Sequence, residues 1–236
     1  MRINRIFYTI ELGLIAVLLI SCTPAKASAT SGGSASITFT TPGRTTTEPA
    51  QTVAPAAPSG QVITAIINAA KAQMAAKSWR VKSNVESNQV TLQGTLEYDA
   101  PDRYHLTTNT IEMISIGSKS FIDENGKWSI SPLNVTDLIA SLMNSALPQA
   151  LENNITNARQ LGPVTLNGKP MLVYQFGNTF TQNNINIATS TKLWVGTADG
   201  LPYQEVIQGN INGVQTTTTN LVEYDPSIKI EDPTAK

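Results

Sequence analysis

Two kinds of hydrophobic pattern alternate along the chain from residue 59 onward. After Ser59, a candidate N-cap, apolar residues recur at helical spacing at Val62, Ile63, Ile66, Ile67, Ala70 and Met74. From Trp79 the period of the apolar residues becomes two, as in strands that bury one face and expose the other to solvent. The pattern predicts strands at Trp79–Glu86, Val90–Tyr98, Tyr104–Thr108, Ile111–Ile116, Lys119–Asp123 and Lys127–Ser131.

Helical spacing returns in the middle of the chain, where Pro148 would end a second helix. Its apolar stripe is formed by Leu138, Ile139, Leu142, Met143, Ala146 and Leu147. Asn-Gly pairs at 125–126, 167–168 and 212–213 are hairpin signals. Further strands are predicted at Arg159–Leu166, Pro170–Phe176, Thr189–Val195, Tyr203–Gln208 and Val214–Tyr224. This order predicts an α+β domain, with an antiparallel sheet packed on helices.

The N-terminal residues have the pattern of a secretory signal peptide. Arg2 and Arg5 precede the apolar run Leu12–Ile20, which is shorter than the roughly 20 residues of a transmembrane helix. The run ends in Leu-Ile-Ser-Cys22, which resembles the lipobox of bacterial lipoproteins. The resemblance implies a signal peptide at residues 1–21, cleavage before Cys22 and acylation of its thiol. The alternative is an ordinary signal peptide cleaved near residues 25–27.

The next segment is poor in apolar residues. From Thr23 to Gly60, 31 of 38 residues are Ser, Thr, Pro, Ala or Gly. This composition cannot bury enough surface to offset the entropy of ordering, so we expect residues 22–60 to be a disordered tether after the lipidated cysteine. An O-glycosylated stalk is the alternative. Residues 61–236 would then form one folded domain.

The charges and reactive side chains exclude several function classes. The 16 basic and 17 acidic residues give a net charge of −1, without the basic footprint of nucleic-acid binding. One His and one Cys cannot build a His/Cys zinc site or a disulfide. His105 alternates with apolar neighbours and is expected to face water, without a nucleophile motif. We therefore predict no catalytic site, metal or cofactor.

Two local motifs resemble the LolA/LolB-like superfamily, and within it the LppX/LprG group of lipoproteins. Leu96–Tyr104 is similar to its "Y-x-x-P-x-[KR]-[FY]" strand-turn-strand, and Leu193–Pro202 to its "L-W-V-D-x-x-x-G-L-P" hairpin, with Gly196 in place of the acidic residue. The resemblance covers about Val62–Tyr224. It implies a strongly curved antiparallel sheet, a half-barrel of about 10–11 strands. This sheet would wrap two or more helices over an apolar cavity for the acyl chains of lipoproteins, glycolipids or phospholipids.

The predicted function follows from that resemblance and the lipobox. We expect a monomeric domain that is attached to the extracytoplasmic side of a membrane through lipidated Cys22. It would bind a lipid or glycolipid for carriage or transfer. A surface interaction or sensing module with a filled core, as in RseB-like relatives, is the alternative. The predicted cavity residues are Trp79, Val81, Val90, Leu92, Leu96, Phe121, Trp128, Leu138, Leu142, Met143, Leu172, Tyr174 and Phe176.

Overall fold

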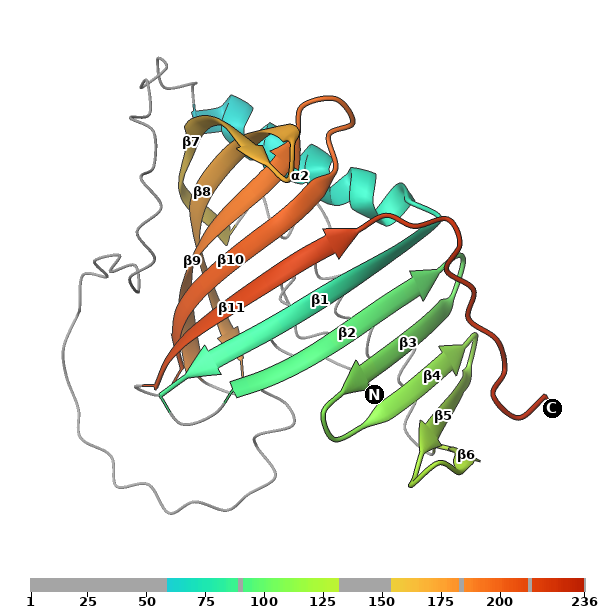
Figure 1. Cartoon of the computed structure of the whole chain (residues 1–236). Coiled ribbons are helices and arrows are strands. Elements are labelled where there is room, and N and C mark those ends of the chain that lie inside the picture. Colours follow the sequence, from blue (N-terminus) through green and yellow to red (C-terminus); the bar gives the residue numbers. More distant parts are fainter. Residues whose placement is uncertain (1–58, 89–90, 132–153, 183–184, 212–213, 236) are drawn as a thin grey trace, which may run out of the picture.

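The computed structural model describes residues 59–235 except for 89–90, 132–153, 183–184 and 212–213 (Figure 1). Within these residues the chain forms helix α2, Ser59–Ala75, and eleven strands. The strands are β1 Ser78–Ser87, β2 Thr91–Asp99, β3 Arg103–Thr108, β4 Glu112–Ile116, β5 Lys119–Asp123, β6 Trp128–Ile130, β7 Ile155–Leu166, β8 Lys169–Gln182, β9 Ile185–Gly196, β10 Pro202–Ile211 and β11 Val214–Glu223.

All strands belong to one curved antiparallel sheet, in the order β6-β5-β4-β3-β2-β1-β11-β10-β9-β8-β7. Two meanders, β1–β6 and β7–β11, are joined where the first strand pairs with the last, so that Val81 lies opposite Val222. The edge strands β6 and β7 do not pair, and the sheet is open. The predicted antiparallel sheet of about this many strands is confirmed.

Helix α2 begins at Ser59, as the sequence predicts, and lies across the ends of β7–β11 in Figure 1. Its buried residues are Val62, Ile66 and Ile67, which belong to the predicted stripe, and Ala69, which does not. Ile63, Ala70 and Met74 of the predicted stripe are partly buried. The predicted second helix falls on residues outside the described part of the chain. Among the described residues, no helix has the length and apolarity that a membrane crossing needs.

Two of the predicted Asn-Gly turns are hairpins in the structure. Asn125 and Gly126 have φ values of 59° and 83° and connect β5 to β6. Asn167 and Gly168 have φ values of 50° and 78° and connect β7 to β8. Positive φ at both central residues suits the twist of the flanking strands, and Asn and Gly tolerate it best. The third pair, 212–213, lies outside the described residues.

The C-terminal segment after β11 runs back along β3–β5 (Figure 1). Ile228 and Ile230 are buried there with Ile114 and Phe121. A hydrogen bond of 2.6 Å from Arg103 to the carbonyl oxygen of Ile230 fixes this segment. The C-terminal segment thus covers one face of the first meander, from which it is separated by about one hundred residues of sequence or more.

Candidate functional site: the inner face of the sheet

The strand register assigns each side chain to one of two faces, because residues directly opposite each other in a ladder point the same way. Val222, Val81, Leu96, Leu106 and Met113 form one such row across β11, β1, β2, β3 and β4. The same face carries the residues that pack against α2. We call it the inner face, and the opposite one the outer face.

One end of the inner face carries an apolar cluster around Trp79, which is fully buried. The Trp79 and Tyr98 rings lie 5.3 Å apart, and Tyr98 and Tyr104 lie 5.2 Å apart. Burial in this cluster raises the pKa of the Tyr104 phenol to about 12. We call this the Trp79 cluster; its buried members are Trp79, Val81, Leu96, Tyr104, Leu106, Met113 and Val222.

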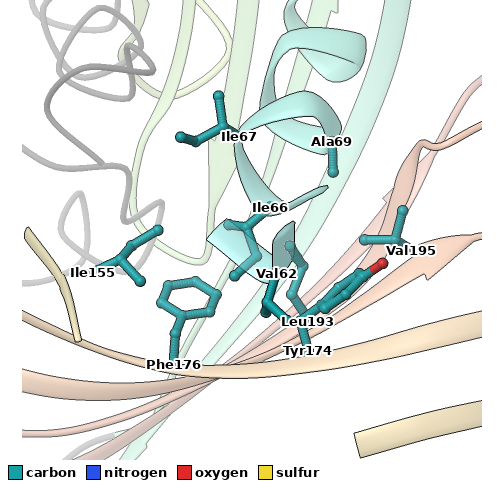
Figure 2. Close-up of a cluster of buried hydrophobic side chains, with 9 residues drawn as sticks. All are labelled: Val62, Ile66, Ile67, Ala69, Ile155, Tyr174, Phe176, Leu193 and Val195. Carbon is teal, nitrogen blue, oxygen red and sulfur yellow. The ribbon is translucent and has the colours of Figure 1, made fainter. Parts of the chain in front are cut away.

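A second apolar cluster lies beneath α2 on the other meander (Figure 2). Figure 2 shows Val62 and Ile66 of the helix close to Phe176, Tyr174 and Leu193 of the sheet. Burial raises the pKa of the Tyr174 phenol. We call this the helix cluster; its buried members are Val62, Ile66, Ile67, Ala69, Ile155, Tyr174, Phe176, Leu193 and Val195.

Polar side chains lie on the inner face between these clusters. Glu205 of β10 is flanked by Leu193 of β9 and Asn220 of β11. Asn220, 1% exposed, donates a hydrogen bond of 3.0 Å to Glu205 and accepts one of 2.8 Å from Ser83. Burial raises the pKa of the Glu205 carboxyl to about 7, although the Asn220 hydrogen bond opposes the shift.

The sequence did not identify these polar residues as inner-face residues. A strand glutamate beside Gln204 and Val206 is typical of a solvent-facing position. The available signal was the alternation itself, which places Glu205 in phase with Ile207, 5% exposed.

Most of the predicted cavity residues in the described part of the chain share the inner face. Trp79, Val81 and Leu96 belong to the Trp79 cluster. Tyr174 and Phe176 belong to the helix cluster, and partly buried Leu172 packs against it. Leu92 is half-buried on the same face, opposite Val85. The remaining residues, Val90, Leu138, Leu142 and Met143, lie outside the described residues.

Phe121 and Trp128 differ from the expected inward placement, because they lie on the outer face. Phe121 is opposite Ile114, whereas the neighbouring pair Met113 and Ile122 points inward. Phe121 packs with Ile228 and Ile230, and Trp128 packs against the same group. We correct the cavity set accordingly: Phe121 and Trp128 are part of a separate core that the C-terminal segment covers.

His105 lies on the outer face within an ion-pair network. Its Nδ1 is 3.0 Å from Glu97 and its Nε2 is 2.9 Å from Glu112. Arg80 donates a 2.6 Å hydrogen bond to Glu97. Burial acts to raise the pKa of Glu97, but hydrogen bonds from His105 and Arg80 and their charges outweigh it, so the pKa is lowered. The imidazole therefore contacts carboxylates on the outer face and is only part-buried.

An open depression of about 450 Å³ lies beside this network. Most of the residues that line it are of polar type, among them Lys82, Asn84, Gln93, Thr95 and Thr107. The large apolar side chain in this lining is Leu221, which is 42% exposed. No group of metal-binding side chains occurs in the described part of the chain. Around β1–β3 the outer face is thus polar and charged, whereas over β4–β6 it carries the apolar core that the C-terminal segment covers.

The three-dimensional fold matches solved structures, whereas no family model and no curated protein matches the sequence. LprF from Mycobacterium bovis matches with a TM-score of 0.54 and 10% identity, over 75% of this chain and 98% of that protein. The Mycobacterium tuberculosis lipoprotein LppX matches with a TM-score of 0.53 and 11% identity, over 74% of this chain and all of that protein. The chain shares the fold of LprF and LppX. The resemblance predicted from two short motifs is therefore confirmed at the level of the fold.

Proposed function

We propose that this protein is a membrane-anchored lipoprotein of the cell envelope that binds the acyl chains of a lipid along the inner face of its sheet, for carriage or transfer. The observation that carries the proposal is the apolar inner face. Two apolar clusters lie on one face of an open curved sheet: the Trp79 cluster spans the β1–β11 junction, and the helix cluster lies between α2 and β7–β9. Apolar, concave surfaces are the usual sites for lipid ligands.

The N-terminal sequence supports attachment to a membrane. Cys22 follows the apolar run Leu12–Ile20 in a lipobox-like context, and it is the chain's single cysteine. Acyl chains contribute about 0.8 kcal/mol per buried methylene, so two chains suffice for stable anchoring. The fold shared with the lipoprotein LppX agrees with this location. We therefore propose that the protein faces the extracytoplasmic side of the membrane.

The proposal is tested by the lipid that copurifies with the full chain. We expect organic extraction of the purified protein to release lipid that mass spectrometry identifies and counts per protein. Leu92 is half-buried on the inner face, outside both clusters, and Leu92→Glu would place a charge beside bound acyl chains. Because a buried unpaired carboxylate is strongly disfavoured, this variant should retain several-fold less lipid.

Leu221→Glu is the matched control. It makes the same substitution on the outer face, at a side chain that is 42% exposed. It should leave the lipid content unchanged. Wild-type protein without copurifying lipid, or equal lipid in the Leu92 variant, would contradict acyl-chain binding. The chain would then be better described as an interaction or sensing module with a filled core.

A further inference from the structure

Glu205 lies in the row of inner-face residues that links the two apolar clusters. Leu193, beside it on β9, belongs to the helix cluster. Asn220 and Ser83 lie on its other side, and Val81 of the Trp79 cluster is in the next row. A lipid whose acyl chains cover both clusters therefore crosses the row that contains the Glu205 carboxyl.

The Glu205 side chain is more accessible than the side chains around it. Leu193, Ile207 and Asn220, its neighbours on β9, β10 and β11, are 8%, 5% and 1% exposed. Glu205 itself is half-buried, so it keeps a contact with water that these neighbours have lost. A ligand that lies on the inner face would displace this water.

No cation compensates the charge of this carboxyl in the described part of the chain. Its hydrogen-bond partner there is Asn220, whose Nδ2 donates to Oε2 at 3.0 Å, and none of the ion pairs involves it. Helix α2, which packs against β10, has Lys71 as its one charged residue, and Lys71 is exposed. Charged residues of β9, β11 and β1 lie on the outer face, namely Lys192, Glu223 and Lys82.

The other titratable groups around Glu205 are phenols, which stay neutral near pH 7. Tyr174 shares its row, and Tyr203 on β10 contacts Tyr224 after β11 with ring centroids 5.5 Å apart. Burial raises the pKa of all three phenols above the ordinary 10. Tyr203 in turn contacts two charged side chains, Lys169 and Asp199, in exposed positions. Among the described residues, Glu205 is therefore the inner-face group whose charge changes near neutral pH.

Covering the carboxyl with acyl chains favours its protonated form. Burial in the fold already raises the pKa of Glu205 to about 7. Apolar chains that displace the remaining water increase the cost of the charge further, because no cation offsets it. The pKa of the carboxyl is therefore higher beneath a lipid than without one.

We propose that the protein takes up one proton on Glu205 when an acyl lipid binds along the inner face, and gives it back when the lipid leaves. The carboxylate takes the proton from the solvent, one O–H bond forms, and the carboxyl becomes neutral. This inference rests on the proposed lipid-binding function and specifies its regulation. Because linkage is reciprocal, a rise in pH then promotes release of the lipid.

The affinity for a lipid as a function of pH tests the proposal. The probe is a diacylglycerol with one pyrene-labelled acyl chain, which does not titrate, in micelles of a non-ionic detergent. Energy transfer from the tryptophans of the full chain to pyrene reports binding. We expect a constant affinity below about pH 6 and an affinity about tenfold lower at about pH 9, as for a difference of about one unit between the free and the lipid-bound pKa.

Glu205→Gln locates the proton. The glutamine oxygen can still accept the hydrogen bond from Asn220 but the side chain is neutral at every pH, so this variant should bind the probe equally well at low and high pH. Glu86→Gln makes the same substitution at an exposed outer-face glutamate and should keep the wild-type pH profile. Circular dichroism should show that the wild-type chain is still folded at the pH where its affinity has fallen.

Three results would overturn the proposal. The wild-type affinity could be independent of pH, Glu205→Gln could keep the wild-type pH profile, or the loss of affinity at high pH could coincide with unfolding. Each of these leaves acyl-chain binding at low pH intact and removes only the coupled proton. A wild-type chain that binds the probe at no pH would instead contradict the proposed function itself.

Discussion

The Asn220 side chain on β11 joins Glu205 on β10 to Ser83 on β1 across the inner face of the sheet. Its amide nitrogen donates to Glu205 at 3.0 Å, and its amide oxygen accepts from Ser83 at 2.8 Å. The two contacts fix the orientation of the amide, because nitrogen and oxygen have different partners. This chain of hydrogen bonds spans the junction of the two meanders and holds the part-buried Glu205 carboxyl on the inner face.

The raised pKa of Glu205 predicts a pH-dependent stability. The carboxyl titrates near its ordinary 4.5 when unfolded and near 7 when folded, so the fold favours the protonated form. Below pH 4.5 the group is protonated in both states and carries no penalty. As pH rises to about 7 and above, the folded state loses stability relative to a neutral side chain.

Glu205→Gln should therefore stabilise the protein at high pH. We expect a gain of about 1–3 kcal/mol in the free energy of unfolding at pH 8 and almost none at pH 4. Denaturant unfolding at both values measures it. Leu193, Asn220 and Ser83, which flank the carboxyl on β9, β11 and β1, do not titrate and leave the comparison simple. Equal gains at both pH values would contradict the raised pKa.

Trp79 should be among the most sensitive positions of the domain. Its side chain is fully buried and contacts the Tyr98 ring within the Trp79 cluster. Trp79→Ala removes this volume and leaves a cavity, so we expect a loss of about 3–5 kcal/mol. Thermal or denaturant unfolding measures it. Leu221→Ala, at an exposed side chain, should cost less than about 1 kcal/mol, and similar losses in both variants would contradict the assigned core.

The C-terminal segment should stabilise the first meander locally. Ile228 is 5% exposed and packs over Phe121 on β5. Ile228→Ala should cost about 2–4 kcal/mol and weaken the cover on that strand. Hydrogen exchange should then become faster in residues 226–235 and in β4 and β5. Exchange in α2 serves as the internal control, and acceleration there to the same degree would mean global unfolding instead.

Cys22 should be required for membrane attachment. Because it is the one thiol of the chain, Cys22→Ser should leave the protein without a lipid and, since cleavage depends on the modified cysteine, uncleaved or released from the membrane. Metabolic labelling with a clickable fatty acid, followed by membrane fractionation, measures both effects. Ser21→Ala keeps a small residue before the cysteine and should still be labelled. Label on the Cys22→Ser protein would refute the anchor.

The local pattern of hydrophobic and polar residues predicted the helix and the strands of the described residues well. The helix at Ser59 and the strands of both meanders correspond to segments whose period changes from helical spacing to alternation. The Asn125-Gly126 and Asn167-Gly168 turns were predictable because few residue types tolerate positive φ at two successive positions. In clearly alternating strands, such as the one containing Trp79 and Val81, the pattern also predicted the inner face.

The pattern failed where neighbouring residues are both apolar. In β4 and β5, Met113 and Ile114, and Phe121 and Ile122, occur as adjacent pairs, so alternation does not say which member points inward. The packing of Ile228 and Ile230 on the outer face determines the choice, because these residues bury Ile114 and Phe121 there. Sequence spacing between β5 and the C-terminal segment contains no signal of this contact.

The amino-acid sequence by itself determined the helix at Ser59, the strands of both meanders, two of their turns, the LolA/LolB-like resemblance and the lipidation candidate Cys22, because these depend on local conformational preference and short motifs. The tertiary structure alone decided the pairing of β1 with β11, the outward placement of Phe121 and Trp128, and the inward placement of Glu205 beside Asn220. Each of these depends on contacts between distant segments. Whether a strand glutamate faces water or the inner face is determined by the strands on both sides of it, and the register of those strands is a property of the whole sheet.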